Sequence, residues 1–204
     1  MDINALNDLK NKYGINPNLI LDVGACNGWF ANLCKSVWPV ASITLIEANP
    51  LFIETLQKTG LHYIITLLGN EQKSNVNFYV SKKDKCSSGC SIYKEISEHF
   101  NEENCDVVYL PMDTLDNLVT DRFDLIKMDT QGSELDIMKG GKNTLNKAKY
   151  LLVEVSLTKC NEGAPLKDEI VNYLKSVNFN LVDVIYSHYL DGNVIQEDVL
   201  FKHV

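Results

Sequence analysis

Residues 19–28 read Leu-Ile-Leu-Asp-Val-Gly-Ala-Cys-Asn-Gly, and the rest of the chain can be interpreted around this stretch. An apolar run ends in a short turn that carries Gly24 and Gly28. The pattern predicts a buried strand, a tight loop and a helix from about Asn27 to Val37. Ligands of open α/β sheets bind outside the carboxyl ends of strands, and glycine lets a ligand approach the backbone closely. This turn is therefore predicted to hold a cofactor.

The spacing within the turn disfavours a dinucleotide. A G-x-G-x-x-G fingerprint needs a glycine beside the pyrophosphate, and Cys26 occupies that position here. A P-loop is excluded because no Lys-Ser/Thr pair follows. Asp22 lies inside the apolar strand, where carboxylates are rare unless paired. We expect it to accept N–H groups of the loop or to face an ammonium group, so a cofactor with an amino-acid end and no pyrophosphate fits best.

A second apolar, β-branched segment, Ser42–Ile46, ends at Glu47, which is 19 residues after Gly28. An acid at the end of the second strand can accept hydrogen bonds from both ribose hydroxyls of an adenosine. The alternative is that Glu47 is a solvated residue at a strand end. Asn49 and Pro50 then predict the start of a helix, with Asn49 as its N-cap.

Together these motifs resemble the class I S-adenosylmethionine-dependent methyltransferases, and within them the FkbM family. The resemblance extends from Leu19 to His203 and is carried by four stretches: Leu21–Gly28, Ile46–Pro50, Met112–Asp116 and Asp124–Leu135 with its continuation to Gly141. The Lys-x-Asp-x-x-Gly-x-Glu pattern at 127–134 is the most family-specific of them. The resemblance implies that S-adenosylmethionine is the cofactor and that a hydroxyl group, often of a sugar, glycan or secondary metabolite, is the acceptor. The residues implied to bind the cofactor are Asp22, Gly24, Ala25, Asn27, Gly28, Glu47 and Ala48.

The expected fold class is α/β. A Rossmann-like class I methyltransferase fold would have a mostly parallel seven-stranded sheet, an antiparallel C-terminal hairpin strand and helices on both faces. The predicted strands are 19–23, 42–47, 62–68, 75–81, 107–112, 123–128, 150–155, 180–187 and 194–202. The predicted helices are 3–13, 27–37, 50–58, 92–100, 114–118, 134–139 and 165–177. The polar segment 82–91 is either a lid near the substrate or an ordinary surface loop.

Composition sets wider limits. The 204 residues suit a single domain, 1–204, in which 1–18 form an N-terminal helix and lead-in. A net charge of −8 disfavours nucleic acid as a partner, and no apolar run is long enough to span a membrane. Six scattered cysteines and the lack of a signal peptide favour a reducing, cytoplasmic location. The oligomeric state is open.

Two carboxylates are expected at the reaction centre. Asp129 and Glu154 end neighbouring predicted strands, so both would face the same crevice. An alcohol is a weak acid, so methylating one requires a base or a metal ion. The pair is predicted to be catalytic, either by binding a divalent cation such as Mg²⁺ through oxygen ligands or because one of them acts as the base. A structural alternative pairs Glu154 with Lys127.

Three further sites have open assignments. Glu134 is a third catalytic candidate, although an acid in the first turn of a helix is also favoured by the helix dipole. His188 is a candidate base, although a lone histidine is more often structural or exposed. Asn70 and Asp113 are both candidates for the polar contact to adenine.

The predicted function is O-methylation of a hydroxyl group, most favourably of a sugar or glycan. The alternatives are an O-methyltransferase of a small secondary metabolite and a non-catalytic binding module that keeps the fold. A nicotinamide-dependent oxidoreductase is disfavoured by Cys26.

Overall fold

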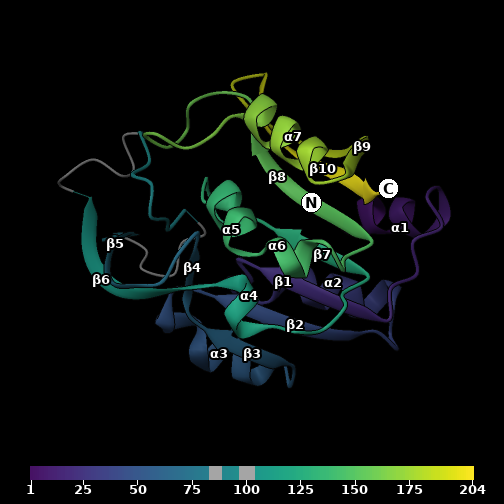
Figure 1. The fold of residues 1–204 in the computed structure, drawn as a ribbon, viewed down its shortest axis with the longest axis horizontal. Helices are drawn as coiled ribbons and strands as arrows, with labels where there is room; N and C mark the ends of the chain where they lie inside the picture. The colour runs from purple at the N-terminus through teal and green to yellow at the C-terminus, as the bar shows by residue number, and fades with distance from the viewer. Residues whose placement is uncertain (83–88, 97–103) are drawn as a thin grey trace.

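The computed structural model describes residues 1–82, 89–96 and 104–204, and its central feature is a seven-stranded sheet (Figure 1). The strand order is β3-β2-β1-β7-β8-β10-β9. The bounds are β1 (Leu19–Val23), β2 (Ser42–Glu47), β3 (His62–Ile65), β7 (Leu125–Met128), β8 (Tyr150–Ser156), β9 (Phe179–Leu190) and β10 (Asn193–His203). Strand β10 is antiparallel to β8 and β9, and the other neighbours are parallel. The predicted fold, with its antiparallel C-terminal hairpin, is confirmed.

The strand order reverses between β1 and β7. From β1 the chain moves outward through β2 to β3, and it returns to pair β7 with the other side of β1. The residues that follow these two strands are Gly24 and Asp129, and the N–H of Asp129 donates to the carbonyl of Val23 at 3.0 Å. Crevices for ligands form at such a reversal point, so the fold itself places the glycine turn beside Asp129.

Helices cover both faces of the sheet (Figure 1). Their bounds are α1 (Ile3–Asn11), α2 (Trp29–Val37) and α3 (Ile53–Lys58) on one face, and α4 (Leu115–Leu118), α5 (Glu134–Gly140), α6 (Lys142–Leu145) and α7 (Lys167–Ser176) on the other. Successive strand residues point to opposite faces of the sheet. Ile20 therefore packs in the apolar cluster under α1, α2 and α3, and Leu21 packs in the cluster under α4 to α7. Burial on both faces explains why the parallel strands are almost continuously apolar.

The prediction of one strand over 62–68 is wrong. The chain forms β3 to Ile65, and the N–H of Thr66 then donates to the carbonyl of Glu47. Strand β4 (Leu67–Gly69) belongs to a second sheet, of order β4-β6-β5, with β5 (Lys73–Ser81) and β6 (Cys105–Thr114). Leu67 packs against Phe78 and Met112 in a third apolar cluster. Since the apolar run continues through the break, the sequence pattern could not reveal the change of sheet.

Several element boundaries also differ from the prediction. Helix α2 begins at Trp29, not Asn27, because Gly28 has a left-handed φ of 79°. The expected helix 50–58 starts as a 3₁₀ turn, η1 (Pro50–Phe52), which Asn49 caps as predicted. Ser133 precedes α5, but its side chain does not cap the helix, since its hydroxyl donates to the carbonyl of Thr130.

Two other predictions concern segments that the structure describes only in part. The helix expected over 92–100 is absent from 92–96, and 97–100 lie outside the described residues. The candidate lid 82–91 is described at its two ends only, at residue 82 and at 89–91.

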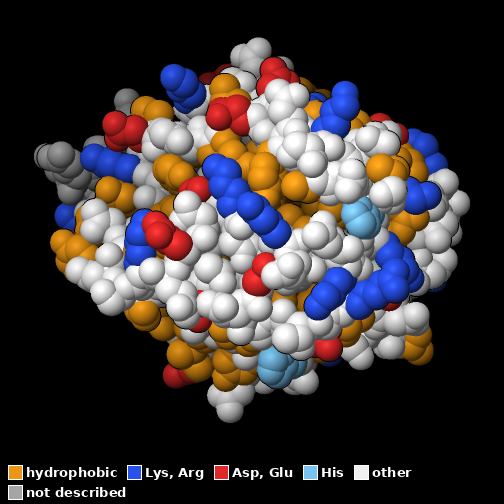
Figure 2. Space-filling view, in the orientation of Figure 1, with side chains coloured by type: hydrophobic (Ala, Val, Ile, Leu, Met, Phe, Trp, Pro, Cys, Tyr) orange, Lys and Arg blue, Asp and Glu red, His pale blue; other side chains and the backbone are white. Residues whose placement is uncertain are grey.

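The surface carries mixed charge on the face shown in Figure 2, where lysine and carboxylate side chains are interspersed with apolar ones. Within the described residues, no helix has both the length and the apolar character that crossing a membrane requires.

Candidate active site

The first wall of the site is the turn after β1. The N–H groups of Gly24 and Ala25 donate to the carbonyl of Ile46 at 2.9 and 3.1 Å, which ties the turn to β2. Gly24 has a φ of 81°, and a Cβ there would lie 1.9 Å from the carbonyl oxygen of Asp129. Only glycine fits this position, because the backbones of two strands meet across it. The turn therefore presents bare main chain to the crevice.

Glu47 stabilises the same turn from the end of β2. Its two carboxylate oxygens accept the N–H groups of Cys26 and Asn49, each at 2.7 Å. Burial raises the pKa of Glu47, and these backbone hydrogen bonds partly offset that rise. The alternative that Glu47 is a solvated strand-end residue is wrong, since its side chain is buried. Each oxygen still has a lone pair with which to accept a ligand hydroxyl.

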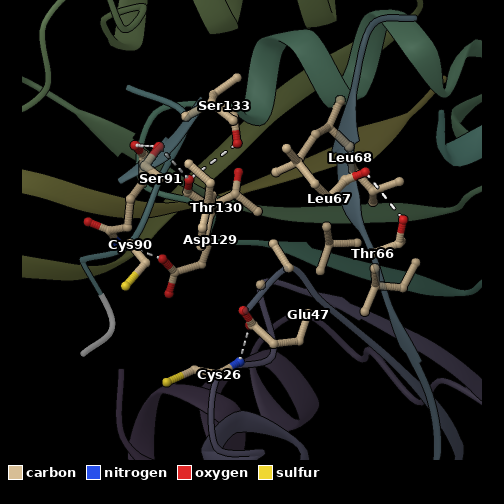
Figure 3. Close-up of a pocket in the computed structure, with 18 of the residues that line it drawn as sticks. Cys26, Glu47, Thr66, Leu67, Leu68, Cys90, Ser91, Asp129, Thr130 and Ser133 are labelled. Carbon is tan, nitrogen blue, oxygen red and sulfur yellow. Dashed lines mark hydrogen bonds between the residues drawn. The ribbon is translucent and has the colours of Figure 1, made fainter. Parts of the chain in front are cut away.

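These elements surround a cavity that is partly open to solvent, and its volume, counted together with that open space, is about 630 Å³ (Figure 3). Glu47 and Cys26 lie on one side of it, Asp129 and Thr130 on another, and Leu67 and Leu68 of β4 on a third. The remaining lining residues are Val23, Gly24, Ile46, Ala48, Phe52, Thr66, Phe78, Cys90, Ser91, Ile92, Gln131, Ser133 and Ile137. Because the chain leaves the main sheet after β3, β4 contributes Leu67 and Leu68 to the cavity wall.

A second hollow, of about 720 Å³, adjoins this cavity. Both are lined by Gly24, Cys26 and Asp129, so they meet at the turn. The other lining residues of the second hollow are Met1, Ala25, Asn27, Trp29, Phe30, Leu33, Lys127, His188 and Asp198. The arrangement offers two adjacent compartments with one carboxylate at their junction.

Asp129, at that junction, is held by two neighbours. Lys127 Nζ donates to its Oδ2 at 2.9 Å, and Gln131 Nε2 donates to its Oδ1 at 2.9 Å. Burial acts to raise the pKa of Asp129, but the Lys127 ammonium and the hydrogen bonds outweigh burial and lower it. Lys127 thus pairs with Asp129, so the structural alternative that pairs Lys127 with Glu154 is wrong.

Glu154 lies beyond Gln131. The same Gln131 amide nitrogen donates to Glu154 Oε2 at 2.8 Å, so one side chain bridges the two carboxylates. Burial raises the pKa of Glu154 well above its usual value, and the charges of Asp129 and Asp198 add to that rise. The Gln131 amide thus lies between Asp129 and Glu154, and Glu154 lines neither hollow. The prediction that both carboxylates face the same crevice therefore holds for Asp129 alone.

Glu134 has a different setting from the other two candidates. Its carboxylate accepts the N–H groups of Thr130 and Gly132 and the Thr130 hydroxyl. This loop needs such support, because Gln131 has a left-handed φ of 55°. Glu134 lines neither hollow, so its contacts are those of a positioning residue.

Asp22, on β1, lines neither hollow, so the structure does not bring this predicted cofactor-binding residue to the cavity wall. Its carboxylate is fully buried and accepts no hydrogen bond from the described residues, so the expectation that it binds loop N–H groups is wrong. Burial raises the pKa of Asp22 to about 6, while the Lys127 ammonium acts to lower it. Its register partner on β7 is Lys127, so the ammonium group it faces belongs to the protein.

The remaining predicted residues divide into two groups. Ala25 and Asn27 line the second hollow and Ala48 lines the cavity. Gly28 lines neither and instead forms the backbone turn before α2. Asn70 and Asp113 line neither. Asp113 instead accepts hydrogen bonds from Gln72, Asn117 and the Thr114 N–H.

Sequence reasoning missed Gln131 and Asp198. Gln131 follows a strand end and offers no distinctive signal. Asp198 directly follows Gln196 and Glu197, so it does not stand out inside an apolar run as Asp22 does.

Comparison with known proteins agrees with this geometry. A family model described as methyltransferase FkbM domain matches residues 22–181. No curated protein matches the sequence. The fold is similar to that of methyltransferase FkbM from Methylobacillus flagellatus KT, at 17% identity and a TM-score of 0.58, over 91% of this chain and 43% of that one. The chain thus spans less than half the length of that protein.

Two other solved structures share the fold. One is an S-adenosylmethionine-dependent methyltransferase from Clostridium acetobutylicum ATCC 824, at 9% identity and a TM-score of 0.56, over 98% of this chain and 90% of that one. The other is the 1,6-didemethyltoxoflavin-N1-methyltransferase of Burkholderia thailandensis with bound 1,6-didemethyltoxoflavin and S-adenosylhomocysteine, at 11% identity and a TM-score of 0.53, over 98% and 77% of the two chains. At these identities the likeness concerns the fold alone.

Proposed function

The chain belongs to the FkbM methyltransferase family, and on that basis we propose that it is an S-adenosylmethionine-dependent O-methyltransferase that acts on a hydroxyl group. The observation that carries the proposal is the junction of two hollows at Gly24, Cys26 and Asp129. A transferase of this kind needs a donor compartment and an acceptor compartment that meet where the methyl group passes. The two hollows meet at the strand-order reversal, where ligands of open α/β sheets bind, and this position supports the proposal.

The lining of the first cavity suits the donor. Glu47 lies where it can accept the two ribose hydroxyls, and Leu67 and Leu68 offer an apolar wall for adenine. Gly24, where any Cβ would collide with the backbone, leaves the main chain open to close approach. When bound, S-adenosylmethionine would supply a methyl group already activated on a positively charged sulfur. Two of the structures with this fold support the choice, one being described as S-adenosylmethionine-dependent and the other containing S-adenosylhomocysteine.

The second hollow suits the acceptor. Asp129 reaches it from the junction, and it can accept the hydrogen of an acceptor hydroxyl and aim the oxygen toward the donor compartment. The proton of the hydroxyl must leave as the new C–O bond forms, and Asp129 lies where it can receive that proton. Trp29 at this hollow is 60% exposed, and a free aromatic face suits the ring of a sugar or of another cyclic acceptor.

Calorimetric titration with S-adenosylhomocysteine tests the donor site. We expect micromolar binding that is weakened in Glu47→Ala and Glu47→Gln. The matched control Glu54→Ala changes an exposed acid on α3 and should bind as the wild type does. If the folded wild-type protein does not bind S-adenosylhomocysteine, the proposal fails.

A panel of hydroxyl acceptors then tests the reaction, with sugars and small cyclic alcohols as separate groups. Asp129→Asn should keep affinity for S-adenosylhomocysteine and lose turnover. Equal loss of both would assign Asp129 to the donor site alone. Binding of S-adenosylhomocysteine without turnover of any acceptor would favour a non-catalytic binding module.

A further inference from the structure

Glu154, His188 and Asp198 come together from the three neighbouring strands β8, β9 and β10. His188 Nε2 lies 3.1 Å from Asp198 Oδ2 and 3.6 Å from Glu154 Oε1. One ligand atom from each residue lies within 4.8 Å of the other two. We propose that these three side chains form a binding site for a divalent metal ion beside the acceptor hollow.

The distances suit coordination. Imidazole nitrogen and carboxylate oxygen bind such ions at about 2.0–2.2 Å, which places two ligands of one ion roughly 3 to 4 Å apart. The two distances to His188 Nε2, 3.1 and 3.6 Å, fall within that range. Asp198 and Glu154 are directly paired across β10 and β8, so the sheet itself fixes two of the three ligands.

The orientation of Glu154 is the second observation. Its Oε2 atom accepts the amide groups of Gln131 at 2.8 Å and Gln196 at 3.1 Å. The other oxygen, Oε1, is therefore the one that faces His188. Metal-binding carboxylates are typically held in this way by an outer shell of hydrogen-bond donors.

Charge balance is the third observation. Glu154 and Asp198 are only 7% and 2% exposed, and buried carboxylates are normally paired or bound to a metal ion. In the described parts of the chain, the ion pairs of both involve His188 alone. Lys127 also acts on both groups electrostatically, but its ammonium group donates to Asp129. A divalent cation bound between the two carboxylates would balance their charges in the ionised state.

The donor set indicates the class of ion. Imidazole suits Zn²⁺ and related transition metals, whereas carboxylate oxygens also suit Mn²⁺. A site with one nitrogen and two oxygen donors therefore favours Mn²⁺ or Zn²⁺ over Ca²⁺. His188 and Asp198 line the second hollow, so an ion there would have an open side toward the acceptor. The catalytic role of the ion, which rests on the proposed function, would be to lower the pKa of an acceptor hydroxyl bound to it.

The site differs from the pair predicted from sequence. Asp129 and Glu154 are bridged by the Gln131 amide, so the space between them is already filled by a hydrogen-bond donor. Glu154 remains a ligand in the proposed site, and His188 and Asp198 replace Asp129.

Titration of the chelator-treated full chain with Mn²⁺ tests the site directly. Free Mn²⁺ is measured by its electron paramagnetic resonance signal, and the heat of binding is measured in parallel. We expect one ion per chain, with affinity at least 10- to 100-fold weaker in Asp198→Asn and in His188→Ala. The matched control is Asp191→Asn, which removes one exposed carboxylate from the β9–β10 turn and should bind as the wild type does. His188 is partly exposed, so His188→Ala keeps the test valid if Asp198→Asn does not fold.

The outcomes separate this inference from the proposed function. Binding that is lost in both site variants and kept in Asp191→Asn supports the metal site. No binding, or equal binding by all variants, overturns it. S-adenosylhomocysteine is titrated into the same samples without metal. Donor binding without Mn²⁺ binding refutes the metal site alone, whereas Mn²⁺ binding without donor binding refutes the proposed function alone.

Discussion

Replacing the buried acid Asp22 with asparagine should change how stability depends on pH. Asp22 is fully buried on β1, and its carboxylate has no hydrogen-bond partner among the described residues. Burial raises its pKa from the ordinary 3.8 to about 6, even though the nearby Lys127 ammonium acts to lower it. The folded protein therefore binds the proton of Asp22 more tightly than the unfolded chain does.

The size of the effect follows from that shift. A rise of about two pKa units corresponds to about 3 kcal/mol between the two protonation states. For an acid whose folded pKa is raised, this stability is present in full below about pH 4, where Asp22 is protonated in both states. It is lost as the pH rises through about 6. Above about pH 7 the wild-type protein contains an ionised, buried carboxylate, and Asp22→Asn does not.

Urea unfolding of both proteins between pH 4 and pH 8 measures the effect. The free energy of unfolding of Asp22→Asn, minus that of the wild type, should rise by about 3 kcal/mol over this range. Other titrating groups are present in both proteins and cancel in the difference. The exposed Asp121→Asn serves as the control and should give a nearly constant difference. A constant difference for Asp22→Asn as well would refute the reasoning, because it would mean that Asp22 titrates alike in the folded and unfolded states.

Three further substitutions have distinct expected outcomes. Gly24→Ala should abolish S-adenosylhomocysteine binding in calorimetry and lower the urea midpoint, because its Cβ would lie 1.9 Å from a backbone oxygen at a φ of 81°. Trp29→Ala should raise the KM for a cyclic acceptor in steady-state assays and leave the affinity for S-adenosylhomocysteine unchanged; a change in both would place Trp29 outside the acceptor role. Glu134→Ala should lower the free energy of unfolding by about 1–3 kcal/mol for each N–H left unpaired, at Thr130 and Gly132, and an unchanged value would argue against its positioning role.

Most of the fold could be predicted because the buried parallel strands have a recognisable apolar sequence pattern. Strands β1, β2, β7 and β8 are apolar on both faces, so each is a short run that local pattern reveals. The break at Thr66 could not be predicted in the same way. The residues on either side are apolar, and only their different packing partners, in different sheets, separate β3 from β4.

The site was predictable where its residues follow strands and unpredictable where they depend on register. Gly24, Glu47 and Asp129 each follow or end a strand of the parallel sheet, and the topology brings such positions together. Asp198 reaches Glu154 only because of the pairing between β10 and β8, which no local pattern encodes. Gln131 is similar, since its amide meets both carboxylates only from a left-handed backbone conformation.

The charges under the junction explain why an energetically costly residue such as Asp22 would be kept. Asp22 and Asp129 share one cation, because Lys127 is the register partner of Asp22 and donates to Asp129. The three groups carry one net negative charge when both acids are ionised. On the proposed function, this charge favours the cationic donor over the uncharged thioether product, which would help to exchange product for donor. Asp22→Asn removes that net charge, so the variant whose stability relative to the wild type rises with pH should also bind the donor less tightly relative to S-adenosylhomocysteine. Calorimetry of both ligands measures the ratio of the two affinities, and an unchanged ratio would show that Asp22 lies too deep to influence the donor.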